Sequence, residues 1–163
     1  MGALRGSRAI WLTAAAAAGI LVCLLAISVP VHAKGKKKRA DLVVKSVDSS
    51  DSTEVGADFE VRALVKNVGK GKAAKSSLGY AFSLDRKPGG DIEFYDSTSV
   101  KALQPKKGAR RTTQTVVPAI EANDYFLIVC ADSEDKIKEK SEANNCRTAE
   151  NKVSVEEIPD QRG

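Results

Sequence analysis

The sequence has very few of the side chains that build catalytic and metal sites. Its 163 residues include one His, one Trp, one Met and three Cys, and aromatic residues make up only 5% of the chain. The single histidine, His32, lies beside a predicted cleavage point, so the polypeptide beyond residue 33 contains none. This excludes enzymes with a histidine base and zinc sites with imidazole ligands from that part of the chain. The length predicts one domain, or at most two small ones.

Residues 1–33 have the pattern of a secretory signal peptide. Arg5 and Arg8 form a basic start, an apolar run extends over residues 9–29, and Ala33 supplies a small residue at the cut. We therefore expect a hydrophobic signal helix and cleavage between Ala33 and Lys34. The apolar run is also long enough to span a bilayer. A protein tethered to the membrane by uncleaved residues 9–29 is the alternative.

A basic linker, residues 34–39, follows the leader. Its charged side chains are Lys34, Lys36, Lys37, Lys38 and Arg39. From Ala40 onward the chain has 19 basic and 21 acidic residues, a net charge of −2, so the sequence pI near 9.1 comes from the leader and the linker. Nucleic-acid binding needs a basic face on the folded domain, and this balance argues against it. The linker is either a flexible, solvated N-terminus or a contact for an anionic surface, lipid headgroups or wall polymer.

Beyond residue 40 the apolar residues follow the period of two that is typical of β-strands. About seven short strands are expected, separated by turn residues roughly every ten positions. The expected segments are 41–47, 59–66, 78–84, 92–94 with 100–103, 111–117, 125–131 and 151–155, and residues 49–53 are expected to form a turn. The pattern predicts an all-β sandwich of antiparallel strands. The continuously apolar segment 125–131 is expected to be its central strand, and the tail 156–163 is polar.

The two cysteines of this region, Cys130 and Cys146, predict a disulfide. An even number of cysteines in an exported domain favours pairing, and Cys130 ends the most apolar strand while Cys146 precedes the last strand. If the two strands are antiparallel neighbours, the pair faces across a hairpin. Closing a loop of about 15 residues stabilises a fold by roughly 3 kcal/mol in the chain-entropy model.

Several stretches together resemble a known family. Residues 125–132 form an apolar strand that ends in Ala131-Asp132, a Glu-x-Asn-Asn follows at 142–145, and an Asp-Leu-Val start lies at 41–43. With Val-x-Asn-x-Gly at 65–69, their order resembles CARDB, the bacterial cell-adhesion-related domain, over residues 40–155. The resemblance implies a seven-stranded immunoglobulin-like sandwich on exported or surface proteins. It also implies no intrinsic catalysis and no cofactor, with roles as an adhesion, spacer or docking module.

Two acidic regions are weighed as sites. Members of that family often carry several Asp residues after the third strand, but here Asp85 and Asp91 are separated by Arg86 and Lys87, which disfavour calcium; whether a cation binds there stays open. The connection before the last strand is also acidic. It contains Asp132, Glu134, Asp135, Glu139 and Glu142. Because lysines alternate with them, a solvated, charge-balanced hairpin is expected there, with Asn144-Asn145 forming a turn, rather than a cation site or a glycosidase carboxylate pair.

The sequence thus predicts a non-enzymatic module, secreted or at the cell surface, that binds a partner protein or a cell-surface polymer, or acts as a spacer. Recognition is expected through loops or edge strands on a rigid support. The tethered protein is the second hypothesis, and a hydrolase is the third and least supported.

Overall fold

A computed structural model describes residues 37–89, 92–93 and 97–157, and Gly35–Gly163 forms one compact unit. Nine β-strands and no helix occur in the described residues. No helix that could cross a membrane is therefore present among them. The expected signal helix, the cleavage point at Ala33 and Lys34, and residues 158–163 lie outside the described residues.

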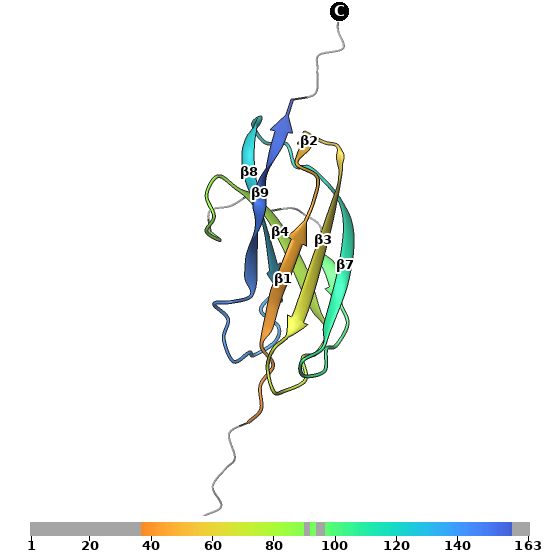
Figure 1. Ribbon diagram of the computed structural model, residues 1–163, viewed down its shortest axis with the longest axis vertical. Helices are drawn as coiled ribbons and strands as arrows, with labels where there is room; N and C mark the ends of the chain where they lie inside the picture. The colour runs from red at the N-terminus through yellow and green to blue at the C-terminus, as the bar shows by residue number, and fades with distance from the viewer. Residues whose placement is uncertain (1–36, 90–91, 94–96, 158–163) are drawn as a thin grey trace, which may run out of the picture. The chain divides into compact units, whose positions relative to one another are not determined.

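The strands form two sheets that pack face to face (Figure 1). The three-stranded sheet has the order β1-β3-β7, and its strands are antiparallel. Its strands are β1 (Leu42–Asp48), β3 (Asp58–Asn67) and β7 (Gly108–Val116). The other sheet has the order β2-β9-β8-β4-β5, with β6 also paired to β4. Its strands are β2 (Ser52–Glu54), β4 (Ser76–Ser83), β5 (Ile92–Glu93), β6 (Thr98–Val100), β8 (Asn123–Ala131) and β9 (Cys146–Glu156).

The all-β sandwich and most of the expected segments are confirmed, with corrections at the edges. Residues 49–53 were expected to turn, but Ser52–Glu54 pairs parallel to β9, so the strands are not all antiparallel. The segment 100–103 forms only the end of β6. Three strands of two or three residues are paired at sheet edges. β5 lies within the expected segment 92–94 and β6 overlaps the segment 100–103 at Val100, whereas β2 is an additional strand. The pairing of β2 needs only backbone hydrogen bonds, so no apolar alternation marks it.

Alternation along each strand builds the core between the sheets. In β3, Phe59, Val61, Ala63 and Val65 are buried while the residues between them are more exposed. Strand β8 lies between β9 and β4, as expected of a central strand, and Leu127, Ile128 and Val129 are almost fully buried. The rings of Phe59 and Phe82 pack at 5.7 Å between centroids across the two sheets. Ala40 is the first described residue that belongs to this core, so the chain from Lys34 contains every described core residue.

Candidate functional site

The chain joins the sandwich at the end where β1 begins and β3 ends, the lower end in Figure 1. Asn67, fully buried at the end of β3, organises this end. Its Oδ1 accepts hydrogen bonds from the backbone N–H groups of Asp41 (3.2 Å) and Gly69 (3.0 Å). Its Nδ2 donates to the carbonyl oxygens of Gly71 (2.8 Å) and Leu103 (3.0 Å). One side chain therefore joins the start of β1 to two loops.

Two glycines let the incoming chain lie directly on the loop that follows β3. A Cβ atom at Gly69 would lie 2.6 Å from the carbonyl oxygen of Arg39, and one at Gly71 would lie 2.4 Å from that of Lys38. The Arg39 carbonyl accepts hydrogen bonds from the N–H groups of Lys70 (3.0 Å) and Gly71 (2.7 Å). The last residues of the basic linker are thus held by their backbone and are not a free tail. The side chains of residues 37–39 are exposed, and Lys34 and Lys36 lie outside the described residues.

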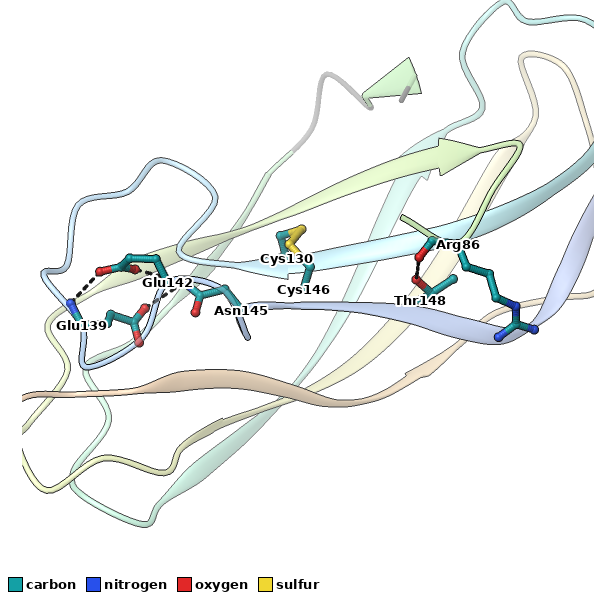
Figure 2. The surroundings of a disulfide bond; sticks show 7 residues. All are labelled: Arg86, Cys130, Glu139, Glu142, Asn145, Cys146 and Thr148. Carbon is teal, nitrogen blue, oxygen red and sulfur yellow. Dashed lines mark hydrogen bonds between the residues drawn. A yellow bond between two sulfur atoms is a disulfide. The ribbon is translucent and has the colours of Figure 1, made fainter. Parts of the chain in front are cut away.

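The predicted disulfide is present and joins Cys130 to Cys146. The two residues are direct partners in the β8–β9 ladder, with Cα atoms 4.0 Å apart. The covalent bond therefore closes the β8–β9 hairpin, residues 131–145, at its base (Figure 2).

The closed hairpin reaches across to the start of β1. The Glu139 carboxylate accepts a hydrogen bond from the backbone N–H of Leu42, and the N–H of Lys140 donates to the carbonyl of Ala40 (2.8 Å). The Asn144 amide donates to the Asp41 carboxylate (3.0 Å). These contacts join residues about 100 positions apart in sequence. Through them the hairpin holds the incoming chain from one side, while the β3 loop holds it from the other.

The expectation of a solvated hairpin is wrong for its central carboxylates. Glu139 is 3% exposed and Asp132 is 4% exposed. Burial raises the pKa of Glu139 to about 7, although the Leu42 N–H lowers it; the nearby carboxylates of Glu142 and Asp132 raise it further. Residues 136–140 alternate strictly, with Ile137 and Glu139 buried and the lysines exposed. Glu139 is buried because it satisfies a backbone donor at a strand start that the sheet leaves unpaired.

The hairpin turns at two places, residues 132–134 and 143–144, so the expected turn at Asn144 is confirmed and a second turn begins at Asp132. Asp132 and Asp135 have positive φ angles of 50° and 49°, whereas Asn144 and Asn145 do not. Asp132 Oδ2 accepts the N–H of Ile137 at 2.7 Å, which stabilises the turn through a side chain that tolerates this backbone region. Asn145 instead donates to Glu139 at 3.1 Å (Figure 2). Asn144 therefore lies in the expected turn, Asn145 bridges the hairpin, and Asp132 stabilises the other turn.

Basic side chains gather at this end of the sandwich, which we call the basic end. Three neighbouring segments, 37–41, 66–75 and 101–108, contain a single acidic residue, Asp41, and it is buried. Hydrogen bonds connect them, since Lys106 N donates to the Asn67 carbonyl (2.8 Å) and Asn67 N to that of Lys107 (2.9 Å). The basic end is defined by the exposed side chains of Lys37, Lys38, Arg39, Lys70, Lys72, Lys106 and Lys107. The inference that a net charge of −2 leaves no basic face is therefore wrong.

The opposite end of the sandwich carries the compensating negative charge, and we call it the acidic end. The segments 48–58, 117–124 and 153–157 meet there and contain no Lys or Arg. Their exposed acidic residues are Asp48, Asp51, Glu54, Asp58, Glu121, Asp124, Glu156 and Glu157. The net charge of the domain is thus a small difference between two strongly charged ends.

Two open strand edges face each other beside the acidic end. Strand β1 is the outer strand of its sheet, and β9 is covered by β2 only at its last three residues. A groove of about 250 Å³ lies between them, lined by residues 46–49 of β1 and its following turn and by 147 and 149–152 of β9, together with Asp51. Unpaired strand edges of this kind can accept an added strand.

The comparisons with known proteins agree with this architecture. The chain matches the CARDB family over residues 39–149, more than half of its length. The chain belongs to the CARDB family. The fold is shared with the CARDB domain of a Pyrococcus furiosus protein crystallised in complex with di-metal ions, at 24% identity and a TM-score of 0.53, covering 73% of this chain and 96% of that one. It is also shared with a domain of a proposed cell surface protein of Methanosarcina acetivorans, at 20% identity and a TM-score of 0.51, covering 77% and 99%. No match appears among curated proteins.

CARDB membership confirms the immunoglobulin-like sandwich and the adhesion- or binding-module class. The metal ions belong to the Pyrococcus domain. Among the residues that the structure describes here, no group of three or more His, Cys, Asp or Glu side chains could hold a metal ion. Asp85 Oδ1 accepts the N–H of Lys87 at 2.7 Å, and Asp91 lies outside the described residues.

The loop that contains Asp85 folds back over the sheet that contains β8 and β9. The Arg86 guanidinium lies 4.6 Å from the centroid of Phe126 and donates to the Glu150 carbonyl at 2.8 Å. Thr148 Oγ1 donates to the Arg86 carbonyl at 3.0 Å (Figure 2). Arg86 therefore has a packing role that the sequence interpretation, which treated it only as a charge that repels calcium, did not assign.

Sequence reasoning missed most residues that build the basic end. In the sequence, Asn67 and Gly69 stand out only as part of a family pattern, and no local pattern marks Lys70 or Lys72. The period of two across residues 136–140 would have placed Glu139 on the same side as Ile137. Once the strands are assigned, the sequence also shows that some loops carry only basic residues and others only acidic ones.

Proposed function

We propose that this CARDB chain acts outside the cytoplasm as a non-catalytic adhesion, binding or spacer module. Its partner is a protein or a cell-surface polymer, contacted through loops and open strand edges on a rigid sandwich. Family membership and the leader pattern of residues 1–33 support the proposal. Carboxylates of the described residues have structural roles, as when Glu139 accepts the hydrogen bond of the Leu42 N–H. The chain beyond residue 33 also has no histidine that could act as a catalytic base.

The Cys130–Cys146 disulfide is the observation that carries the extracytoplasmic assignment. Disulfides persist in oxidising compartments and are rare in the reducing cytosol. This one lies at the base of the hairpin that holds the start of β1. Export would thus give the hairpin, and the end of the domain that depends on it, a covalent closure.

Binding would use two kinds of surface. The groove between β1 and β9 presents unpaired backbone groups to an extended segment, which is how strand addition works. The loops at the two ends present concentrated charge of opposite sign, which favours charged partners. The sheets between them supply rigidity.

The leader determines whether the module is free or attached. Cleavage between Ala33 and Lys34 gives a soluble mature protein. Retention of residues 9–29 gives the tethered alternative. The exposed side chains of Lys37, Lys38 and Arg39, which follow the leader, favour this alternative, because basic residues bind anionic headgroups near them. N-terminal sequencing of the exported protein distinguishes the two, since a start at Lys34 removes the tether.

The proposal is tested by capture with the purified domain from Lys34 to Gly163. We expect specific retention of a protein or polymer from the cell-envelope or culture fraction, identified by mass spectrometry or glycan analysis. The matched control is the same domain after acylation of its lysines, which removes the lysine charge of the basic end and leaves the loops of the acidic end unmodified. Recovery of the native protein from the cytosol with both cysteines as free thiols would contradict the proposal.

A further inference from the structure

Resting on the proposed export of the chain, we infer that the basic end of the sandwich docks on an anionic phospholipid surface and that the acidic end faces away from it. The committed partner is a bilayer that contains anionic headgroups. The contact involves the folded domain itself, in addition to Lys37, Lys38 and Arg39 of the linker.

The first argument is the convergence of positive charge from separate parts of the chain. Lys70 and Lys72 come from the loop after β3, and Lys106 and Lys107 come from the loop before β7. Backbone contacts place both loops beside Arg39, since its carbonyl accepts the Lys70 N–H and the loops pair at Ala73 and Leu103. A single exposed surface thus continues the positive charge of the linker onto the rigid domain.

The second argument is that this charge is not neutralised locally. The acidic residue within these segments, Asp41, is buried and accepts the amide of Asn144. The neighbouring hairpin exposes three acidic and three basic side chains over residues 133–142, so it adds no net charge. No ion pair is formed by Lys70, Lys72 or Lys107 among the described contacts. These cations are therefore available to an external anion.

The third argument concerns which anionic partner fits. Two grooves of the described surface lie beside β1, β9 and residues 48–51, toward the acidic end, and the basic end presents lysines from loops around the incoming chain. Loop-borne cations around an exposed end suit a planar surface better than a strand of polymer that needs a groove. The apolar run at residues 9–29 also directs the N-terminal side of the chain to a membrane during export.

The fourth argument is orientation. The acidic end carries eight exposed acidic residues in segments without Lys or Arg. An anionic bilayer attracts the basic end of the sandwich and repels the acidic end. The line that joins the two ends should therefore stand upright on the bilayer surface. The exposed large apolar side chains of the described residues are Leu84, Ile92 and Val116, none of which lies at the basic end. The contact should therefore be electrostatic and reversed by salt.

The test measures binding of the purified domain, residues 34–163, to vesicles of phosphatidylglycerol and phosphatidylcholine by sedimentation. We expect binding to the anionic vesicles at low salt, none to pure phosphatidylcholine, and release by salt. Replacing Lys70, Lys72 and Lys107 by Gln should weaken binding about 100-fold, at about fivefold for each lost charge. Circular dichroism checks that these exposed substitutions leave the fold intact.

The matched control removes the same charge elsewhere, by Lys45→Gln, Lys87→Gln and Lys152→Gln, and should weaken binding only slightly. Equal loss in the two triple variants would overturn the proposal, as would unchanged binding when the basic end is neutralised. Binding of polyphosphate or duplex DNA in place of vesicles would identify another polyanion and also overturn it. Capture of an envelope protein without vesicle binding would reject this inference and leave the proposed function standing.

Discussion

The buried carboxyl group of Glu139 makes the stability of this domain depend on pH near neutrality. In the folded protein its pKa is raised from 4.5 to about 7, chiefly because burial disfavours the charged form. Each pKa unit corresponds to about 1.4 kcal/mol, so the whole shift corresponds to about 3 kcal/mol of unfolding free energy. This is a large part of the stability of a small domain.

The sign follows from the two protonation states. Below pH 4.5 the carboxyl group is neutral in both folded and unfolded chains, and its full contribution is present. As the pH rises from 4.5 to about 7, the unfolded chain releases the proton while the folded chain retains it, so stability falls. Above about pH 7 the contribution of about 3 kcal/mol is lost.

The assay is urea unfolding of residues 34–163 at pH 5 and pH 8, with wild type and Glu139→Gln. The chain beyond residue 33 has no histidine, so few other groups titrate in this window. Gln replaces one of the two acceptor oxygens, which costs stability equally at both pH values, and that cost cancels in the pH difference. We expect wild type to lose between about 2 and 3 kcal/mol from pH 5 to pH 8 and the variant to lose little.

The matched control is Glu150→Gln, a substitution at an exposed glutamate of β9. It should retain the wild-type dependence on pH. If Glu139→Gln loses as much stability between pH 5 and pH 8 as wild type does, the burial argument is refuted. An unchanged m-value would confirm that both proteins unfold over the same surface area.

Three further predictions concern the contacts that build the basic end. Replacing Cys130 and Cys146 together by Ala should lower the free energy of unfolding by about 3 kcal/mol, and dithiothreitol should produce the same loss in wild type but none in the variant. Gly69→Ala should destabilise by about 1–3 kcal/mol in thermal unfolding, because its Cβ would overlap the backbone of Ala40, whereas a neutral result would show that the loop can move away. Asn67→Ala removes four hydrogen bonds at a buried site and should cost about 3 kcal/mol or more in urea unfolding, with faster tryptic cleavage of the basic linker; unchanged cleavage would mean that the linker is held without it.

The sandwich was predictable because burial imposes a pattern on the sequence. Strand β3 shows it most clearly, since Phe59, Val61, Ala63 and Val65 face the core and the residues between them do not. Strand β2 shows the limit, because Ser52–Glu54 has no fully buried side chain and pairs only through its backbone. Neighbours in space that are distant in sequence leave no local pattern, so the parallel pairing could not be read.

The candidate site was predictable in its covalent part and not in its polar part. The two cysteines needed only the assumption that two antiparallel strands are neighbours, and they are direct partners. In the sequence, Glu139 is one of several acidic residues that alternate with lysines. Its hydrogen-bond donor, the backbone N–H of Leu42, is 97 positions away, so the local sequence does not indicate that Glu139 is buried. A buried polar residue is explained by its partner, and the partner is set by the tertiary fold.

The same tertiary contacts explain how a domain with a net charge of −2 exposes a strongly basic end. Asp41 and Glu139 lie at that end, and both are withdrawn from the surface, Asp41 beside Asn144 and Glu139 on the backbone of Leu42. Both carboxylates accept hydrogen bonds inside the domain, from the Asn144 amide and the Leu42 N–H, and neither forms an ion pair with Lys70 or Lys107 among the described contacts. These lysines therefore stay exposed without a carboxylate partner. The net charge of the domain does not show where on the surface the charges lie. For this reason a value of −2 did not reveal the basic end.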